Sequence, residues 1–418
     1  MSKSSWLKLG LIFFLLVLAG VLLYQIPAVN LRVSWRLDIA RTYVRNVVNP
    51  IGEVPTPLPQ PVAAITSFPT HTPEAELTKI PLTTSTPAAT ATQTAVPTAV
   101  PEFVNLGSPA WEYQTPNNCG PATLSLYLKT HNWNGDQTSI SDLLKPETGD
   151  RNVNVEELTY YVRTQVGWLN VEFRVGGDIE TLKKFIAAGL PVMIEEGELL
   201  EGEYWPDDDR WAGHYLLLTG YDDAAQSFIA QDTFRSPDRN VPYQSVQENW
   251  QAFNYVYLLV FRPDQEEMVK SILGEDWDAD INRQKALELA ETQTETDPQN
   301  PFTWFNLGSN LVYFERFQEA AQAYDTARQL GLPQRMLRYQ FGPFFAYFFG
   351  ERNDDLLVLT EYALQRTPNS EETLLWHGWG KYRAGDTQAA ISDFQAALAE
   401  NRFYQDAEYA LDYVAANP

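Results

Sequence analysis

The sequence predicts an α+β domain followed by an all-α repeat domain, with a transmembrane helix and an extended stalk ahead of both. Three observations lead to this prediction. An uncharged apolar run lies near the start, a Thr/Pro-rich tract follows it, and the pattern changes near residue 281 from mixed helix and strand to helix alone. With 418 residues, the chain has room for two or three domains.

The first expected element is the apolar run. Residues 9–31 contain no charged side chain, and about 20 apolar residues cross the hydrocarbon core of a bilayer. We interpret the run as an uncleaved transmembrane anchor, with a cleaved signal peptide as the alternative. Basic residues flank it on both sides, so charge alone does not set its orientation.

The second expected element is a stalk over residues 50–102. Within 55–101, 10 of the 47 residues are Pro and 12 are Thr, and no apolar face recurs. Such a segment cannot build a core, so we expect it to be disordered and extended. Stalks of this kind hold a domain away from a surface. The sequence therefore predicts a single-pass protein of the cell membrane, with its domains on the extracellular side.

Residues 103–262 carry the pattern of the α+β domain. Short apolar runs rich in β-branched and aromatic residues follow a set of helical patterns. The helices are expected over 119–131, after Ser139, over 154–165 and from Asp178 to Gly189. The strands are expected over 190–196, 213–221, 227–234 and 255–261.

Residues 281–416 have an internal repeat, after an acidic connector. Large, small and aromatic residues stand at the spacing of tetratricopeptide repeats. The first unit has Trp304, Leu307, Gly308, Ala320, Tyr324 and Ala327, and Gly378, Ala390, Phe394 and Ala397 recur 70 residues after their counterparts. Each unit is expected to be a helix pair, and residues 404–415 a capping helix. The concave surface of such repeats suits docking of a protein partner.

Composition excludes several classes of function. The chain has 54 acidic and 30 Lys or Arg residues, a net charge of -24, and so acidic a body repels nucleic acid. Its one cysteine cannot form an internal disulfide or a cysteine-rich zinc site, and its four histidines lack metal-ligand spacing. Glycine-rich phosphate loops are absent. We expect no metal, no cofactor and no nucleic-acid partner.

The candidate nucleophile is the single cysteine, Cys119. It precedes Gly120, Pro121 and a helical run, and proline suits the first turn of a helix. A thiol at this end of a helix dipole favours its nucleophilic thiolate form. The alternative is a buried structural cysteine, but two polar residues directly precede Cys119, which places it at the start of the helix and not on its apolar face.

The other candidates follow from what a thiol nucleophile needs. His214 opens an apolar strand and is the candidate base, and Asp232 ends the next strand, where it is placed to orient the imidazole. Sequence cannot settle whether the two side chains share a face, because one bulge reverses it. Gln114 is a candidate donor to a developing oxyanion, together with the Cys119 backbone N–H. The acidic stretch over 195–209 is expected to be a solvated loop.

These residues carry a resemblance. Gln114, Cys119-Gly120-Pro121-Ala122, His214 in a Gly-His-Tyr-Leu-Leu-Leu strand and Asp232 resemble the papain-like cysteine peptidases related to the double-glycine leader (bacteriocin-processing) peptidases, in their stand-alone branch. The resemblance implies a papain-like α+β fold, a triad of Cys119, His214 and Asp232, and Gln114 in the oxyanion hole. Where the family commonly has Pro after the triad Asp, this chain has Thr233, and the transporter domains that accompany the exporter-linked members are missing.

The predicted function is that of a membrane-anchored cysteine peptidase that hydrolyses peptide bonds, with repeats that dock a peptide or protein. Two alternatives remain open. One is a catalytically silent peptide-binding scaffold, and the other is a thiol amidase that acts on cell-wall peptides.

Overall fold

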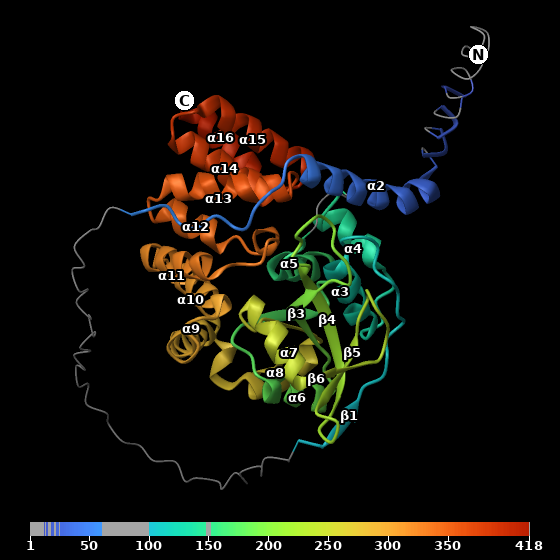
Figure 1. Cartoon of the computed structure of the whole chain (residues 1–418). Helices are drawn as coiled ribbons and strands as arrows, with labels where there is room; N and C mark the ends of the chain where they lie inside the picture. Colours follow the sequence, from blue (N-terminus) through green and yellow to red (C-terminus); the bar gives the residue numbers. More distant parts are fainter. Residues whose placement is uncertain are drawn as a thin grey trace, which may run out of the picture.

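A computed structural model of the chain describes residues 12, 14–15, 18–20, 22–24, 26–60, 100–147 and 152–417 (Figure 1). A mixed α/β region with one large sheet is followed by a stack of helices that ends at the C-terminus. The blue N-terminal helix, α2 (Pro27–Val48), lies beside both.

The predicted transmembrane anchor is wrong. Among the described residues, no helix is both long enough and apolar enough to cross a membrane. The long helix near the start is α2, which begins at Pro27 near the end of the apolar run and includes four arginines. Much of 9–31 lies outside the described residues. The localisation inferred from this anchor, a single-pass protein of the cell membrane, is corrected with it.

The predicted stalk separates into two parts. Residues 61–99 lie outside the described residues. Residues 50–60, expected to be disordered, follow an extended path and hydrogen-bond to side chains of the helical region. The composition correctly indicates that this stretch forms no core of its own, but its backbone carbonyls find partners elsewhere.

The sheet has seven strands in the order β2-β7-β3-β4-β5-β6, with β1 paired to β4. All the pairings are antiparallel. The strands are β1 (Phe103–Asn105), β2 (Asn170–Arg174), β3 (Val192–Leu199), β4 (Trp211–Asp222), β5 (Ser227–Gln231), β6 (Arg239–Pro242) and β7 (Tyr257–Phe261). The four expected strands correspond to β3, β4, β5 and β7, whereas the short edge strands carry too little apolar pattern to be predicted.

Three of the described helices of this region begin at a capping side chain, that of Asp136, Asn154 or Asp178. Asp178 accepts a hydrogen bond from the Thr181 N–H, and Asn154 forms a capping box with Glu157. The helices are α3 (Cys119–Lys129), α4 (Gln137–Leu144), α5 (Val155–Gln165), α6 (Ile179–Ala187) and α7 (Tyr243–Trp250). The expected acidic connector contains α8 (Glu266–Leu273).

The C-terminal region is a series of helix pairs in which small residues admit close packing. A Cβ added at Gly308 would lie 2.8 Å from the ring of Tyr324, and one at Gly378 would lie 2.5 Å from Phe394. The same contact thus recurs after 70 residues. The helices are α9 (Ala279–Thr296), α10 (Pro301–Tyr313), α11 (Phe317–Leu330), α12 (Gly342–Phe349), α13 (Asn353–Arg366), α14 (Glu371–Arg383), α15 (Thr387–Glu400) and α16 (Gln405–Ala416).

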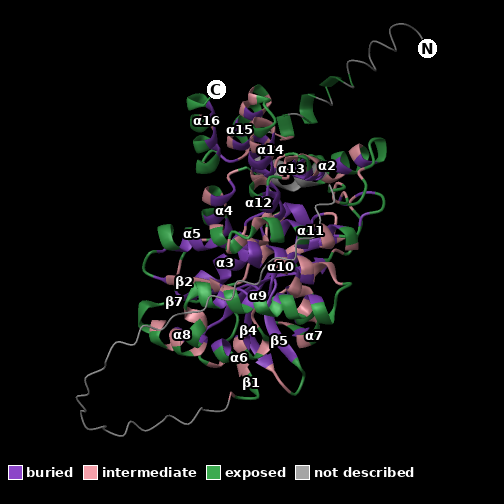
Figure 2. Cartoon of the chain, turned by 90° about the vertical axis from the view of Figure 1, so that its left-hand side faces the viewer, coloured by how far each residue is buried: buried purple, intermediate pink, exposed green. Residues whose placement is uncertain are grey.

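The two regions share one hydrophobic core. A cluster of buried residues joins α3 and β4 to α10, α11 and α13, and Figure 2 shows buried residues on both sides of this boundary. The acidic stretch contributes to the boundary. Asp208, expected in a solvated loop, is buried and pairs with Arg335 of the helical region through contacts of 2.6 Å. The sequence does not predict this ion pair because Arg335 lies 127 residues farther along the chain.

Candidate active site

Cys119 is the first residue of α3, as the sequence predicts. The loop before it is held from several sides: Lys145 donates to the Asn117 carbonyl at 2.7 Å, and the buried Asn118 donates to Gln137 at 2.9 Å. Cys119 itself is partly exposed, unlike the residues that follow it in the helix. The local sequence therefore places the thiol at the positive end of a helix and keeps it open to a cavity.

A bulge in the hairpin brings His214 and Asp232 to the same face. The register of β4 and β5 shifts between Leu218 and Gly220. The pair Leu217–Gln231 beyond this shift places Asp232 opposite Leu216, which has the same parity as His214. Without the bulge, the register that pairs Gly220 with Ile229 would continue along the hairpin. Asp232 would then lie opposite residue 217 and point to the other face of the sheet. Both side chains are buried, and His214 Nε2 lies 3.0 Å from Asp232 Oδ1.

The hydrogen bond to Asp232 defines the role of each imidazole nitrogen. The carboxylate Oδ1 accepts from Nε2 and also from the backbone N–H groups of Phe234 and Arg235. The imidazole and the side chain of Cys119 line the same cavity. Since Nε2 is engaged by Asp232, Nδ1 is the nitrogen that remains for the thiol.

The electrostatics of the site favour a charged imidazole. Burial disfavours the charged form, but the charge of Glu198 and the hydrogen bonds with Asp232 and Cys119 outweigh it and hold the pKa of His214 well above its ordinary value. Burial alone would raise the pKa of Asp232, but the hydrogen bond and charge of His214 lower it strongly. Each partner therefore favours the charged form of the other, so a proton taken up by His214 is stabilised by Asp232.

Gln114 reaches the same site from the loop before α3. Its backbone N–H donates to the Thr233 carbonyl at 2.9 Å, and its side-chain Oε1 accepts from the Thr233 hydroxyl at 3.0 Å. Since Oε1 is engaged by this hydroxyl, the Nε2 donor is the end that remains for a ligand. Thr233 stands where the resembling family commonly has Pro, and in this chain it orients Gln114.

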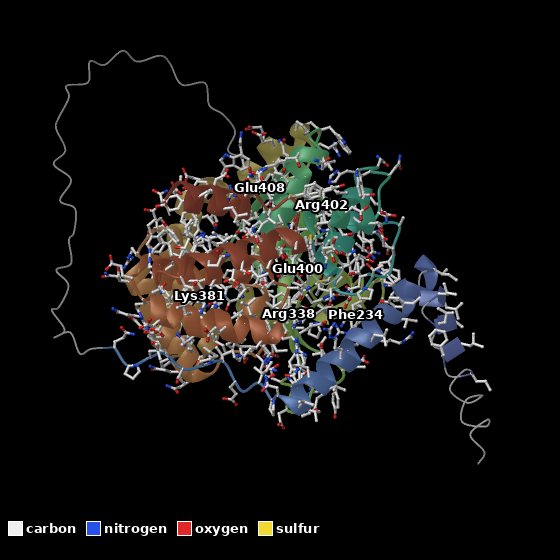
Figure 3. All side chains as sticks on the ribbon, turned by 90° about the horizontal axis from the view of Figure 1, so that it is seen from above. Phe234, Arg338, Lys381, Glu400, Arg402 and Glu408 are labelled. Carbon is white, nitrogen blue, oxygen red and sulfur yellow. The ribbon has the colours of Figure 1, made fainter. Side chains whose placement is uncertain are left out.

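A cavity of about 430 Å³ contains Gln114, Cys119 and His214 in its lining. The same α/β region adds Glu198, Trp205 and Phe234, and the helical region contributes Arg335, Arg338 and Tyr339. Figure 3 labels Phe234 and Arg338, which face this cavity from the two regions. Two residues of α2, Ile39 and Thr42, complete the wall. Sequence reasoning missed these walls because no local motif links them to Cys119.

The comparisons with known proteins are consistent with this geometry. Residues 106–258 match the model of the Peptidase_C39 like family. This match confirms the predicted resemblance of the α/β region to peptidases of that kind. No curated protein matches the chain.

Several solved structures are similar to parts of the chain. A putative C39-like peptidase from Bacillus anthracis is 18% identical, covers 39% of this chain and 98% of its own, and has a TM-score of 0.32. Xylellain, a cysteine protease from Xylella fastidiosa, is 13% identical, covers 39% and 87%, and has a TM-score of 0.30. The tetratricopeptide-repeat protein YrrB is 18% identical, covers 42% and 81%, and has a TM-score of 0.30.

Proposed function

We propose that the Peptidase_C39-like region hydrolyses peptide bonds as a cysteine peptidase, with Cys119 as nucleophile, His214 as general base and acid, and Asp232 as the residue that orients the imidazole. The observation that carries the proposal is a chain of three groups: Cys119 and His214 line one cavity, and His214 is hydrogen-bonded to the buried Asp232 at 3.0 Å. A buried structural cysteine has no need of such a chain. The match of residues 106–258 to a peptidase family supports the same assignment.

The mechanism follows from the atoms in reach of one another. In the reactive pair the proton of the Cys119 thiol resides on His214 Nδ1, and the thiolate attacks the carbonyl carbon of the scissile amide. The carbonyl oxygen becomes an oxyanion. The imidazolium then gives its proton to the leaving amine, the C–N bond breaks, and a thioester remains on Cys119. Water, deprotonated by His214, hydrolyses the thioester and restores the thiol.

The oxyanion is stabilised by the Gln114 amide and the Cys119 backbone N–H. The first four N–H groups of a helix have no partner within the helix, so the N–H at the start of α3 is available. Gln114 lines the same cavity and offers Nε2, since its Oε1 is engaged by Thr233. Preorganised donors of this kind lower the barrier because they need not turn toward the charge as it forms.

The helix pairs serve as a docking surface for the peptide or protein substrate. A second cavity, of about 1010 Å³, lies between them and the α/β region, and its lining includes Phe345, Trp376 and Tyr404. Tyr339 lines both this cavity and the catalytic one. A chain bound along the helix pairs would therefore lie next to the cavity that contains Cys119.

The test is a profile of the purified full chain against a peptide library, with Cys119→Ala as the matched control. The wild type should cleave a subset of peptides and react with an electrophilic affinity probe, and the variant should do neither. A wild type that is labelled at Cys119 but cleaves no peptide would favour the silent scaffold. Release of ammonia or cleavage confined to cell-wall peptides would favour the amidase. Labelling that survives in Cys119→Ala would refute the assignment of the nucleophile.

A further inference from the structure

The N-terminal segment is attached to the helix pairs by an unusual set of contacts. We call residues 27–60 the strap: it consists of α2 and the extended residues 49–60. Figure 1 shows the blue trace of the strap passing from α2 across α12 and α13. Within the extended part, Val54 is buried in the core shared by the two regions, and Ile51 packs against that core.

Three buried side chains hold the extended part of the strap. Arg328 donates to the carbonyls of Pro55 and Thr56 at 2.8 and 3.1 Å. Arg366 donates to the carbonyls of Ile51 and Gly52, both at 2.7 Å, and Asp355 accepts from the Leu58 N–H at 3.0 Å and from the Gln60 side chain at 3.0 Å. We call Arg328, Asp355 and Arg366 the clamp.

The clamp selects a backbone conformation rather than a set of side chains. Most of its hydrogen bonds to the strap involve backbone atoms. Arg328 and Arg366 each bind the carbonyls of two consecutive strap residues. Pro55, Pro57 and Pro59 lack an N–H and favour the extended polyproline conformation, which leaves carbonyls free to accept. The clamp thus fits an extended, proline-containing segment with a small apolar residue at the position of Val54.

The strap is also part of the catalytic cavity. Ile39 and Thr42 of α2 line the cavity that contains Cys119 and His214. The clamp is linked to the same wall, because the guanidinium of Arg366 lies 4.9 Å from the ring of Trp205, another lining residue. Asn46, near the end of α2, contacts Arg366 at 3.3 Å. Occupancy of the clamp and the position of α2 are therefore mechanically connected.

We propose that the clamp is a binding surface for extended, proline-containing peptide segments, that residues 51–60 of the chain occupy it in cis, and that this occupancy keeps α2 across the catalytic cavity. The effect of the strap on substrate access rests on the proposed function, whereas the binding of an extended peptide to the clamp does not. A peptide of the same chemistry supplied in trans displaces the strap and opens the cavity. The contacts are non-covalent and formed by an irregular segment, which is the kind of structure that opens locally.

The first experiment compares two Val→Asp substitutions in the full chain. Val54→Asp places a charge in a buried site, whereas Val48 is 79% exposed at the end of α2, so Val48→Asp is a matched control. The rate of Cys119 alkylation is measured with iodoacetamide, which is small, and with a bulky maleimide. Val54→Asp should raise the rate with the maleimide about tenfold, since the opened state becomes more populated, and change the rate with iodoacetamide far less. Val48→Asp should match the wild type.

Amide hydrogen exchange over residues 49–60 shows whether the strap has been released. If this segment exchanges fast in Val54→Asp and the maleimide rate is unchanged, α2 does not close the cavity and the proposal is overturned. If the segment stays protected, the clamp does not depend on the apolar contact, which also overturns it.

The second experiment needs no variant of the protein. The synthetic peptide NPIGEVPTPLPQ, residues 49–60, is titrated into the wild type, and the same peptide with Asp in place of Val54 is the control. The first peptide should raise the maleimide rate and the exchange of residues 49–60 in a saturable way, and the control should not. Equal effects of the two peptides, or none from either, would refute the clamp as a binding surface. Alkylation reads access to the thiol, so a chain that opens but cleaves no peptide disproves the peptidase and leaves the clamp standing.

Discussion

The buried ion pair between Asp208 and Arg335 allows the most quantitative prediction. The side chain of Asp208 is fully buried and that of Arg335 is 2% exposed. Each guanidinium Nη atom lies 2.6 Å from one carboxylate oxygen, and Asp208 also accepts from the N–H groups of Tyr204 and Arg210. Asp208→Asn removes the charge and places an amide NH₂ against a guanidinium, so two charge-assisted hydrogen bonds weaken. The buried cation loses its nearer counter-ion and keeps only Asp209, at 3.5 Å.

The expected cost follows from these contacts. Hydrogen bonds to charged groups contribute about 1.5–3 kcal/mol each, and loss of one partner of a buried pair costs about 3–5 kcal/mol. We therefore expect Asp208→Asn to lower the free energy of unfolding by about 3–5 kcal/mol. The double variant with Arg335→Met should be more stable than the single variant, because the unpaired charge is gone. Urea unfolding followed by tryptophan fluorescence measures both.

The control is an ion pair at the surface. Arg262 and Asp264 form a salt bridge of 2.9 Å with side chains 50% and 69% exposed, and Asp264→Asn should leave the unfolding midpoint unchanged. Burial would raise the pKa of Asp208, but its hydrogen bonds with Arg335 lower it below the ordinary value. A lowered pKa contributes stability at neutral pH that is lost as the pH falls through the folded-state pKa, so the variant should lose less stability on acidification than the wild type. If Asp208→Asn behaves like Asp264→Asn, the argument fails.

Two further predictions concern the site. Thr233→Val removes the hydroxyl that orients the Gln114 amide, so kcat on a cleaved peptide should fall about 2- to 13-fold with little change in KM, and Thr233→Ser should restore it; an unchanged kcat would argue against this role of Thr233. Burial next to Glu198 and Asp232 raises the pKa of Glu196 from 4.5 to about 7, despite the opposing charge of His214. A raised carboxyl pKa means that stability falls as the pH rises from about 4.5 to 7, so Glu196→Gln should be more stable than the wild type at pH 8 by roughly 3 kcal/mol and nearly equal to it at pH 4. A variant that is less stable at pH 8 would contradict this.

The parts of the fold that were predicted are those encoded locally. The start of α3 at Cys119 follows from the sequence Asn-Asn-Cys-Gly-Pro, because proline fixes the first turn. The pairing of Gly308 with Tyr324 recurs at Gly378 and Phe394, and the spacing of small and aromatic residues predicts it. In each case the signal lies within a single element or repeat.

The relation between His214 and Asp232 marks the limit of such reasoning. Their closeness in the hairpin could be predicted, but their shared face depends on the bulge at Thr219, and nothing in its apolar surroundings identifies that residue as the extra one. The anchor failed for a different reason. An uncharged stretch satisfies a hydropathy criterion wherever it occurs, but no helix among the described residues is long and apolar enough to cross a membrane, and α2 carries polar and basic residues along its length.

The walls of the catalytic cavity depend on contacts that no local pattern contains. Asp208 meets Arg335, and Asn254 meets Asn310 at 2.8 Å, across separations of 127 and 56 residues. Both pairs join the α/β region to the helix pairs, and both are buried, so these bonds exist only while the two regions are docked. It follows that the cavity around Cys119 has its observed shape only while the helix pairs remain docked. A change in the helical region can therefore alter access to Cys119 without touching any residue of the proposed triad.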